Sequence, residues 1–414
     1  MMEISFAGAA NEVGRSAIVI ENKEKILLDY GLKLNHEEEP EYPLKVSPNH
    51  VFLSHAHLDH IGAVPFLTKH GYIGNFYATD LTIDLMRVML EDSAKIAKME
   101  GYNVRYSKKD VRETLNRCIS APYGKTLSFK NFSATFVDAG HVPGSAGIII
   151  EAGNRKIFYT GDMRVEDTRL VGGMKEFPKA DALVIESTYA ERNHPDRKEE
   201  EKRFLDNVRE TLETGGVVLI PAFALGRSQE MLLLLEGLKY PVYVDGMARE
   251  ATNIIKNYKS YLKDGSRLDK VCKNVGFVKD NRERERIIEE PCAIVTTAGF
   301  VQAGPSVFYI RRLCLKKNSS ILIPGFQVEG SPGRQLLDHK TYSLDGEVIK
   351  VGLRVDRFDF SAHGDRSELL KTINKVNPEK VFVIHGDYCE KFAAELKEMG
   401  FNAFAPEVGN KFSL

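Results

Sequence analysis

The sequence of 414 residues predicts an α/β protein in which a second α/β domain, with a parallel sheet, is inserted into the first. Strand-like and helix-like segments alternate over residues 1–190, and the same pattern returns from residue 361. Between these two regions the same sequence pattern occurs three times: an apolar strand, a turn rich in glycine or proline, and a helix start. That order is typical of parallel α/β sheets. We therefore expect a first domain over 1–190 and 361–414, interrupted by an inserted domain over 191–360.

The elements of the first domain follow from apolar patterning. Short apolar runs predict strands over residues 17–20, 25–29, 51–54, 134–137, 146–150, 156–159 and 380–384. The first two are expected to pair across a turn at 21–24. Apolar residues at helical spacing predict a helix over 81–99, and Ser107 with Asp110 resembles a capping box that starts another. A further helix is expected from about Arg366.

The inserted domain carries the three strand-turn-helix repeats. Their strands are expected over 217–220, 293–296 and 321–323. Each following turn could aim backbone N–H groups at a phosphate, because helix N-termini attract anions. The candidate phosphate- or RNA-binding residues in these turns are Arg227, Ser228, Gly304, Ser306, Ser331 and Arg334. The plainer interpretation is that the turns only cap helices, with Pro305 and Pro332 in the first helical turn.

Composition limits the functions that the chain can serve. Lys+Arg 57 against Asp+Glu 58 gives a net charge of −1, so any site for a polyanion must be a local surface. The five cysteines are scattered and lack C-x-x-C spacing, which argues against a disulfide framework or a thiolate zinc site. No signal segment or membrane-spanning run is evident. We therefore expect a cytoplasmic protein.

The most informative stretch is His55-x-His57-x-Asp59-His60, directly after an apolar strand. Alternate positions of an extended segment point the same way, so His55 and His57 can bind one metal ion. Asp59 and His60 then face a second ion. Imidazoles mixed with carboxylates suit zinc best, and manganese or iron would also bind. A surface histidine cluster is the alternative, which a bare H-x-H pair would favour and the complete motif does not.

Three later residues complete a candidate two-ion site. His141 lies in a turn after a strand and would be the third imidazole on the first ion. Asp162 ends another strand and would bridge the two ions, while His385 would supply the remaining nitrogen to the second. Two cations about 4 Å apart can lower the pKa of a bridging water and stabilise charge on the attacking and leaving oxygens. That chemistry suits hydrolysis of a phosphodiester.

One series of residues resembles a known family. In chain order these residues are Asp29, His55, His57, Asp59, His60, His141, Asp162, Glu186, His363 and His385. The series up to Asp162 resembles the metallo-β-lactamase superfamily, and the last three residues resemble its β-CASP branch of nucleic-acid-processing nucleases. Residues 221–227, 325–330 and 361–365 are most similar to the endonuclease subunit of the cleavage and polyadenylation specificity factor and its archaeal relatives. The resemblance implies a metallo-β-lactamase αββα sandwich with an inserted β-CASP domain.

The resemblance also implies a role for each residue. Metal ligation is implied for His55, His57, Asp59, His60, His141, Asp162 and His385. Asp29 is implied to orient ligands from behind. Glu186 would hold His363, which would contact the scissile phosphate and protonate the leaving oxygen, because a histidine kept cationic by a carboxylate is a good proton donor. Asp59 joins these two as a catalytic residue. His385 is typical of members that cleave RNA rather than DNA.

The sequence therefore predicts a zinc-dependent endoribonuclease with two ions. It would hydrolyse RNA phosphodiesters by a metal-bridging hydroxide and leave 3′-hydroxyl and 5′-phosphate ends, in RNA processing or 3′-end cleavage. A 5′-to-3′ exoribonuclease of the RNase J type shares these motifs and stays open. An inactive scaffold subunit is disfavoured by the complete ligand set, and a small-molecule hydrolase by the inserted domain. The expected partner is single-stranded RNA, with no membrane, and the chain could act as a homodimer or within an RNA-processing complex.

Overall fold

The computed structural model describes residues 2–34, 39–100, 105–344 and 346–414. The chain divides into two compact units. The first unit consists of Met1–Asp167, Gly172–Asn193 and His363–Leu414. The second unit consists of Thr168–Val171 and His194–Ala362. Among the described residues, no helix is long and apolar enough to cross a membrane.

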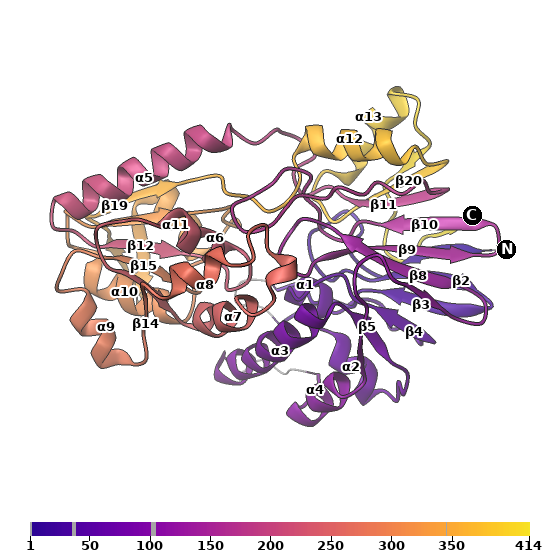
Figure 1. Cartoon of the computed structure of the whole chain (residues 1–414), viewed down its shortest axis with the longest axis horizontal. Helices are drawn as coiled ribbons and strands as arrows, with labels where there is room; N and C mark the ends of the chain where they lie inside the picture. Colours follow the sequence, from indigo (N-terminus) through magenta and orange to yellow (C-terminus); the bar gives the residue numbers. More distant parts are fainter. Residues whose placement is uncertain (1, 35–38, 101–104, 345) are drawn as a thin grey trace. The chain divides into compact units, whose positions relative to one another are not determined.

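Two seven-stranded sheets form the first unit. The first sheet has the order β22 (Lys411–Ser413), β1 (Glu3–Phe6), β2 (Ile18–Asn22), β3 (Glu24–Leu28), β4 (His50–Phe52), β5 (Phe76–Ala78) and β6 (Cys118–Ser120). β3, β4, β5 and β6 run parallel to one another. β1 pairs antiparallel with β22, so the two ends of the chain lie side by side (Figure 1).

The second sheet brings four parallel strands to one edge. Its order is β21 (Ala403–Phe404), β20 (Lys380–Ile384), β11 (Ala182–Glu186), β10 (Arg155–Tyr159), β9 (Ala146–Ala152), β8 (Ser133–Asp138) and β7 (Thr126–Ser128). β10, β11 and β20 run parallel, and β8 shares their direction because β8 and β10 are both antiparallel to β9. The carboxyl ends of these four strands therefore meet at the same edge.

The two sheets pack face to face over one apolar core. Phe6 and Phe52 of the first sheet join Phe136 and Phe382 of the second in a single buried cluster. The other face of the second sheet buries Leu183 and its neighbours against two helices, α12 (Arg366–Val376) and α13 (Cys389–Glu398). On the side of the first sheet lie α1 (Leu58–Ile61), α2 (Val64–Lys69), α3 (Asp80–Glu100) and α4 (Lys108–Leu115). This layering confirms the predicted αββα sandwich.

A six-stranded sheet forms the centre of the second unit, and all its strand pairs are parallel. Its order is β14 (Val275–Phe277), β13 (Val242–Asp245), β15 (Ala293–Thr296), β12 (Val218–Pro221), β16 (Ser320–Ile323) and β19 (Arg354–Arg357). A separate hairpin is formed by β17 (Thr341–Leu344) and β18 (Glu347–Lys350). The predicted parallel α/β insertion is confirmed.

Eight helical segments accompany this sheet in the described part of the chain. They are α5 (Arg197–Glu213), α6 (Arg227–Leu234), α7 (Met247–Ile255), the 3₁₀ helix η1 (Lys259–Tyr261), α8 (Arg267–Cys272), α9 (Asn281–Ile287), α10 (Pro305–Leu313) and α11 (Pro332–His339). Helices α6, α10 and α11 begin directly after the three predicted turns. Pro305 and Pro332 lie in the first helical turn, as expected.

One helix was not predicted and one turn needs correction. α5 begins at Arg197 in a run of charged residues, which masked its helical character. Phe204, Val208 and Leu212 recur at intervals of four and are buried, which was the available signal. The turn expected over 21–24 is also shorter: β2 and β3 are separated by Lys23 alone, which turns the chain with a φ of 57°.

Candidate metal centre

The predicted ligands all lie in the first unit, at the carboxyl ends of strands. His141 follows β8, Asp162 follows β10 and His385 follows β20. The His55 motif follows β4, where the chain stays extended through His57, with φ −72° and ψ 146°, and then enters α1. This change of backbone separates the two histidines of the extended segment from Asp59 and His60 on the helix.

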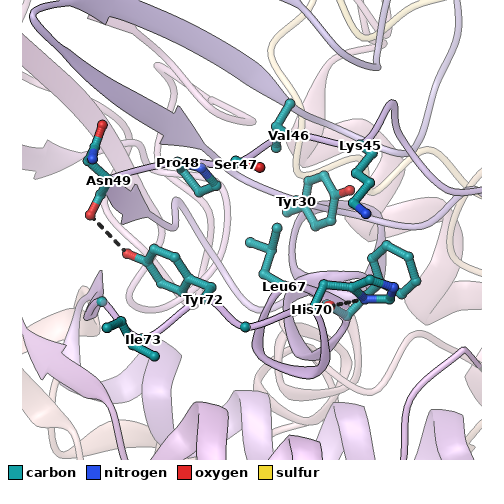
Figure 2. Close-up of a pocket in the computed structure, with 13 residues that line it drawn as sticks. Tyr30, Lys45, Val46, Ser47, Pro48, Asn49, Leu67, His70, Tyr72 and Ile73 are labelled. Carbon is teal, nitrogen blue, oxygen red and sulfur yellow. Dashed lines mark hydrogen bonds between the residues drawn. The ribbon is translucent and has the colours of Figure 1, made fainter.

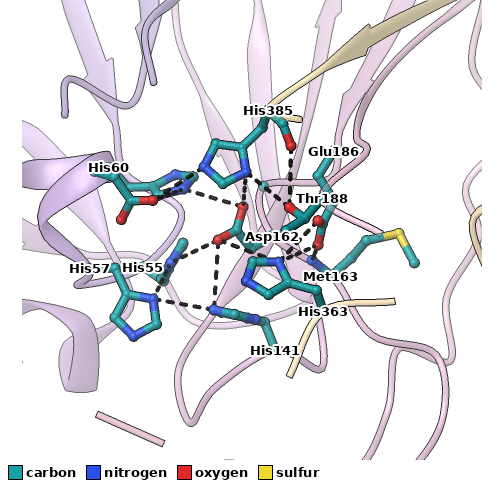
Figure 3. Close-up of polar contacts among 12 residues, drawn as sticks. His55, His57, His60, His141, Asp162, Met163, Glu186, Thr188, His363 and His385 are labelled. Atoms are coloured by element: carbon teal, nitrogen blue, oxygen red, sulfur yellow. Dashed lines mark hydrogen bonds and ion pairs between the residues drawn. The ribbon is translucent and has the colours of Figure 1, made fainter. Parts of the chain in front are cut away.

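Three imidazoles and one carboxylate oxygen form the first group. His57 Nδ1 lies 3.0 Å from His55 Nε2 and 3.2 Å from His141 Nε2. Asp162 Oδ2 lies 3.5 Å from His55 Nε2 and 3.7 Å from His141 Nε2 (Figure 3). A tetrahedral zinc ion with bonds of about 2.0–2.1 Å separates its ligand atoms by about 3.3 Å. The four atoms therefore have a spacing that one such ion could bridge.

The second group forms around the other oxygen of the same carboxylate. Asp162 Oδ1 lies 3.3 Å from His60 Nε2, and Asp59 Oδ2 lies 3.2 Å from His385 Nε2. In both groups all ligand atoms lie within 4.8 Å of one another. Among the described residues, Asp162 Oδ1 is buried without a hydrogen-bond donor. A cation would satisfy this oxygen, so the residues present fit a two-ion centre with Asp162 as the bridge.

Electrostatics agree with a cation-binding role. Burial lowers the pKa of His55 well below its ordinary value and also lowers the pKa of His57, so both are neutral, as metal ligation requires. Burial alone would lower the pKa of His60 and His385 too, but the carboxylates of Asp162 and Asp59 act together with their neighbours to raise both. Cations in these positions would displace the protons that the histidines otherwise share with the carboxylate.

Asp29 orients ligands of both groups from behind. Its Oδ2 lies 2.7 Å from His60 Nδ1, which leaves Nε2 of that ring to face Asp162. Ser54 donates its backbone N–H and its hydroxyl to Asp29 at 2.7 and 2.6 Å, and the same hydroxyl lies 3.0 Å from His55 Nδ1. Tyr159 donates its hydroxyl to Asp29 at 2.7 Å. The sequence singled out Asp29, but it missed Ser54 and Tyr159.

Thr188 is another residue of the site that was not predicted from the sequence. Its hydroxyl lies 3.3 Å from His385 Nδ1, so Nε2 of that ring is the nitrogen turned toward Asp59. Thr188 follows β11 and His385 follows β20, and the register of these parallel strands pairs Glu186 with Ile384. Residues just past two paired strand ends lie at the same level, which is the signal that could have found the threonine.

The predicted acid and its partner lie beside both groups. His363 Nδ1 lies 3.0 Å from each oxygen of the buried Glu186 carboxylate, and 3.9 Å from Asp162 Oδ2. Met163 N donates to Glu186 at 2.7 Å, which fixes the carboxylate. Burial would lower the pKa of His363, but Glu186 together with the carboxylates of Asp162 and Asp59 raises this pKa to about 9. With 22% of its side chain exposed, His363 can reach a substrate.

Missed by the sequence, Arg164 and Glu368 hold the segment that carries the acid. Arg164 is buried and donates from Nη1 to the carbonyl oxygen of His363 at 3.2 Å. Glu368 accepts the backbone N–H of Val165 at 2.7 Å with one oxygen and that of Asp365 at 3.0 Å with the other. The turn after β10 and the turn before α12 are therefore joined at the site.

The six candidate phosphate-binding residues lie in the second unit, in turns that follow three adjacent strands, β15, β12 and β16. Each serine hydroxyl donates to a carbonyl of its own turn, at 2.7 to 2.9 Å: Ser228 to Phe223, Ser306 to Ala303 and Ser331 to Val328. Gly304 caps α10 with a φ of 68°, and Arg334 pairs with Asp338 at 2.6 Å. Arg227 is the first residue of α6. These contacts close turns and cap helices, and phosphate binding by these residues stays a prediction.

A cavity of about 340 Å³ lies elsewhere in the first unit and contains none of the predicted site residues (Figure 2). Its walls include Tyr30, Lys45, Tyr72 and His70. The ring of His70 bonds the carbonyl oxygen of Phe66 at 2.9 Å, at the end of α2. This histidine therefore has a local structural partner, and the metal centre is the stronger candidate for function.

The fold and the site together define a class: an αββα hydrolase with a His/Asp metal centre at the carboxyl ends of its strands. Comparison with protein families agrees. The family described as "Metallo-beta-lactamase superfamily" matches residues 10–242, the "Beta-Casp domain" matches 228–336, and the "Zn-dependent metallo-hydrolase RNA specificity domain" matches 348–406. The chain belongs to the β-CASP branch of the metallo-β-lactamase superfamily.

Curated relatives match over almost the whole chain. "Probable RNase MJ4" of Methanocaldococcus jannaschii is 40% identical and is covered over 100% of both chains. "RNase aCSPSF2" of Saccharolobus solfataricus is 36% identical over 99% of this chain and 85% of its own. "Transcription termination factor FttA" of Methanocaldococcus jannaschii is 35% identical over 96% and 69%. A solved Enterococcus faecalis protein of unknown function shares the fold, with a TM-score of 0.66, 15% identity and 100% coverage of both chains.

Proposed function

We propose that this protein is a zinc-dependent ribonuclease that holds two ions per chain and cuts RNA internally. The single observation that carries the proposal is the pair of four-residue groups that share Asp162, with His363 beside them. The names of the relatives, which include two RNases, support RNA as the substrate. The description of the family matched at 348–406 names both zinc and RNA.

The two groups divide the ions between them. One ion would be held by His55, His57, His141 and Asp162, and the other by Asp59, His60, His385 and Asp162. Nitrogen-rich sites with carboxylates favour zinc, and manganese or iron would also be accepted. When bound, two cations supply a more acidic water and stabilise negative charge on the attacking and leaving oxygens of a phosphodiester.

His363 and Glu186 supply the proton that the leaving group needs. Because Nδ1 of His363 is held by both oxygens of Glu186, Nε2 is the nitrogen that can donate to a substrate. A water that has lost a proton to solvent forms the new bond to phosphorus, and the bond to the 3′-oxygen breaks. His363 protonates that oxygen and then regains a proton from solvent. The products are a 3′-hydroxyl and a 5′-phosphate.

The preference for RNA over DNA is tested with RNA and DNA oligonucleotides of the same base sequence. We expect cleavage of single-stranded RNA to exceed cleavage of single-stranded DNA and of duplex RNA, because His385 is typical of family members that act on RNA. The initial rates on the three substrates give the answer. Equal rates on DNA and RNA would contradict this part of the proposal.

Circular RNA tests internal cleavage against a 5′-to-3′ exonuclease. The same gel should compare a circle with linear RNAs that carry a 5′-hydroxyl, monophosphate or triphosphate. We expect the circle to be cut and every linear RNA to give discrete intermediate products, because similarity of residues 325–330 to cleavage-factor endonucleases favours internal cutting. Release of mononucleotides from the monophosphate alone, with intact circles, would favour the exonuclease. Asp162→Asn protein purified in parallel controls for contaminating nucleases.

A further inference from the structure

Three turns of the second unit are joined into one surface at the carboxyl edge of its parallel sheet. Gln327 Nε2, in the turn after β16, donates to Gly299 O in the turn after β15 at 3.0 Å. Gly333 N in α11 donates to Phe300 O at 3.1 Å, and Ala222 N, after β12, donates to Thr296 O at 2.8 Å. These bonds fix the turns relative to one another, so the side chains at their tips lie along the same edge of the sheet.

Aromatic rings occupy the tips of these turns. Phe223 is 40% exposed and Phe326 is 46% exposed, while Phe300 is partly exposed. The rings of Phe223 and Phe300 meet edge to face with centroids 5.0 Å apart. Phe223 also lies against the backbone of Gly299, where an added Cβ would be 3.1 Å from its ring. Phe223 is therefore held in place although much of its ring faces solvent.

The same surface has a polar side suited to a nucleic acid. Helices α6, α10 and α11 all begin at these turns, and the positive ends of their dipoles favour phosphate groups nearby. Gln327 is only 2% exposed, and its Oε1 has no hydrogen-bond donor among the described residues. That oxygen points at the first turn of α11, where a Cβ on Gly333 would lie 1.7 Å from it. Gln327 therefore lies beneath the surface and holds the turns together, while the exposed rings are left to contact a ligand.

We propose that Phe223, Phe300 and Phe326 form a stacking surface for the bases of single-stranded RNA. Aromatic side chains bind unpaired bases of any sequence by stacking, while the positive N-terminal ends of the helices attract the phosphates of the RNA backbone. This arrangement explains how a chain with a net charge of −1 can hold a polyanion. The inference rests on the proposed function, because it assigns a binding site to the same RNA substrate.

The exposed area favours RNA over a protein partner. Two phenyl rings exposed to 40% and 46% offer less than about 250 Å² between them. A stable protein interface buries about 800 Å² on each partner. A single stacked base needs only one ring face, which matches what the turns present.

The absence of tryptophan from the chain allows a direct test. Phe223→Trp introduces a single fluorescent reporter at the proposed surface, and His363→Ala in the same chain slows cleavage during the titration. We expect single-stranded oligouridylate and oligoadenylate to quench this fluorescence saturably, because a stacked base contacts the indole. Leu315→Trp is the matched control, since Leu315 is 75% exposed beyond the other end of α10, and its fluorescence should stay unquenched. Equal quenching of both reporters, or quenching of neither, would overturn the proposal.

Affinity variants separate stacking from general apolar contact. Phe223→Ala and Phe223→Leu should each raise the Kd and KM for RNA roughly 5- to 100-fold, the range for loss of one stacked base, and Phe223→Tyr should restore most of the affinity. Phe326→Ala, at the more exposed ring, gives a second variant if Phe223→Ala does not fold. Wild-type affinity in Phe223→Leu would overturn the proposal. So would unchanged RNA affinity together with loss of a dimer in sedimentation, which would make the surface a contact between copies.

A small substrate distinguishes this inference from the proposed function. Rates with bis(p-nitrophenyl) phosphate report the metal centre without an RNA strand that must reach the turns of the second unit, so KM for RNA is compared with that rate in each variant. An equal loss on both substrates would count against a specific role in RNA binding. If the unaltered protein cleaves neither substrate, the proposed function fails, while the fluorescence titration still decides whether bases bind at Phe223.

Discussion

The two units use the same place in their folds, the carboxyl ends of parallel strands, in opposite ways. In the first unit, nitrogen and oxygen atoms of six strand-end or helix-start residues converge on Asp162, and one of its oxygens lacks a hydrogen-bond donor among the described residues. In the second unit, the serine hydroxyls at the turns close those turns themselves, as Ser228, Ser306 and Ser331 show. The rings of Phe223 and Phe326 are among the side chains that remain exposed there.

This difference shows that the hydrogen-bond partners of polar atoms at a strand end indicate which ligand that strand end can bind. A carboxylate oxygen that is buried among imidazoles without a hydrogen-bond donor favours a cation, because buried polar groups without partners are costly. Satisfied turns require nothing, so only their exposed side chains can be assigned to a ligand. Strand-end position alone therefore predicts where a site can be, and the partners of each polar atom indicate what it can bind.

The largest effect is expected from Asp162→Asn, which breaks the metal centre at the residue that both groups share. The amide has the same shape but cannot bridge two cations, so cleavage of RNA should be abolished and metal content should fall. Elemental analysis and cleavage rate are measured on the same preparation. Lost activity with both ions retained would argue against the bridging role.

His363→Ala should remove the proton donor and leave the ligand groups intact. We expect the cleavage rate to fall about 10²- to 10⁴-fold, the usual contribution of a positioned acid, with the metal content unchanged. Glu186→Gln should weaken the same step, because an amide cannot hold the cationic ring electrostatically. His70→Ala, outside the site, is the control and should retain the normal rate. If His363→Ala sheds an ion, the histidine is a ligand rather than the acid.

Asp29→Asn tests whether the residues behind the ligands matter. Asp29 has a φ of 58°, a conformation that asparagine tolerates, so the backbone should survive the change. We expect metal affinity or activity to fall about 10- to 100-fold, because the amide no longer fixes the ring of His60. Competition with a chelator measures the affinity. Tyr159→Phe removes one of the bonds to Asp29 and should have a smaller effect in the same direction; an equal or larger effect would contradict this ranking.

The smallest effect is expected from Ser331→Ala in the second unit. The Ser331 hydroxyl caps α11 by accepting the N–H of Arg334, so its loss should lower the free energy of unfolding by about 1 kcal/mol. RNA affinity should stay unchanged if the turn is only a cap. Denaturant unfolding and RNA titration are compared on the same protein. A fall in RNA affinity at unchanged stability would show that this hydroxyl contacts RNA after all.

Much of the metal centre could be predicted because its ligands carry a local signal. The spacing of His55 to His60, the strand-end positions of His141 and Asp162, and His385 after an apolar run are all visible in the sequence. Tyr159 and Thr188 were missed because tyrosine and threonine are common strand residues. Their partners, Asp29 and His385, are 130 and 197 residues away in the chain, so only the sheet order brings each pair together.

The fold shows the same division between local and distant information. The capping box of Ser107 and Asp110 and the prolines at the starts of α10 and α11 were read correctly, because their signals lie within a few residues. α5 was missed because charge dominates its first turns and its buried positions begin only at Phe204, apart from Glu200. The apolar face of α5 becomes evident only when the parallel sheet of the second unit is known, because both faces of such a sheet must be covered.

The most direct test of the two-ion centre is the number of metal ions per chain in protein that has been purified without any chelator. Elemental analysis should be made on the unaltered protein whose RNA cleavage rate is known. The shared Asp162 and the seven ligand residues predict two ions per chain, zinc in both positions, and loss of cleavage when they are removed. One ion or fewer per chain in fully active protein would contradict the two-ion centre.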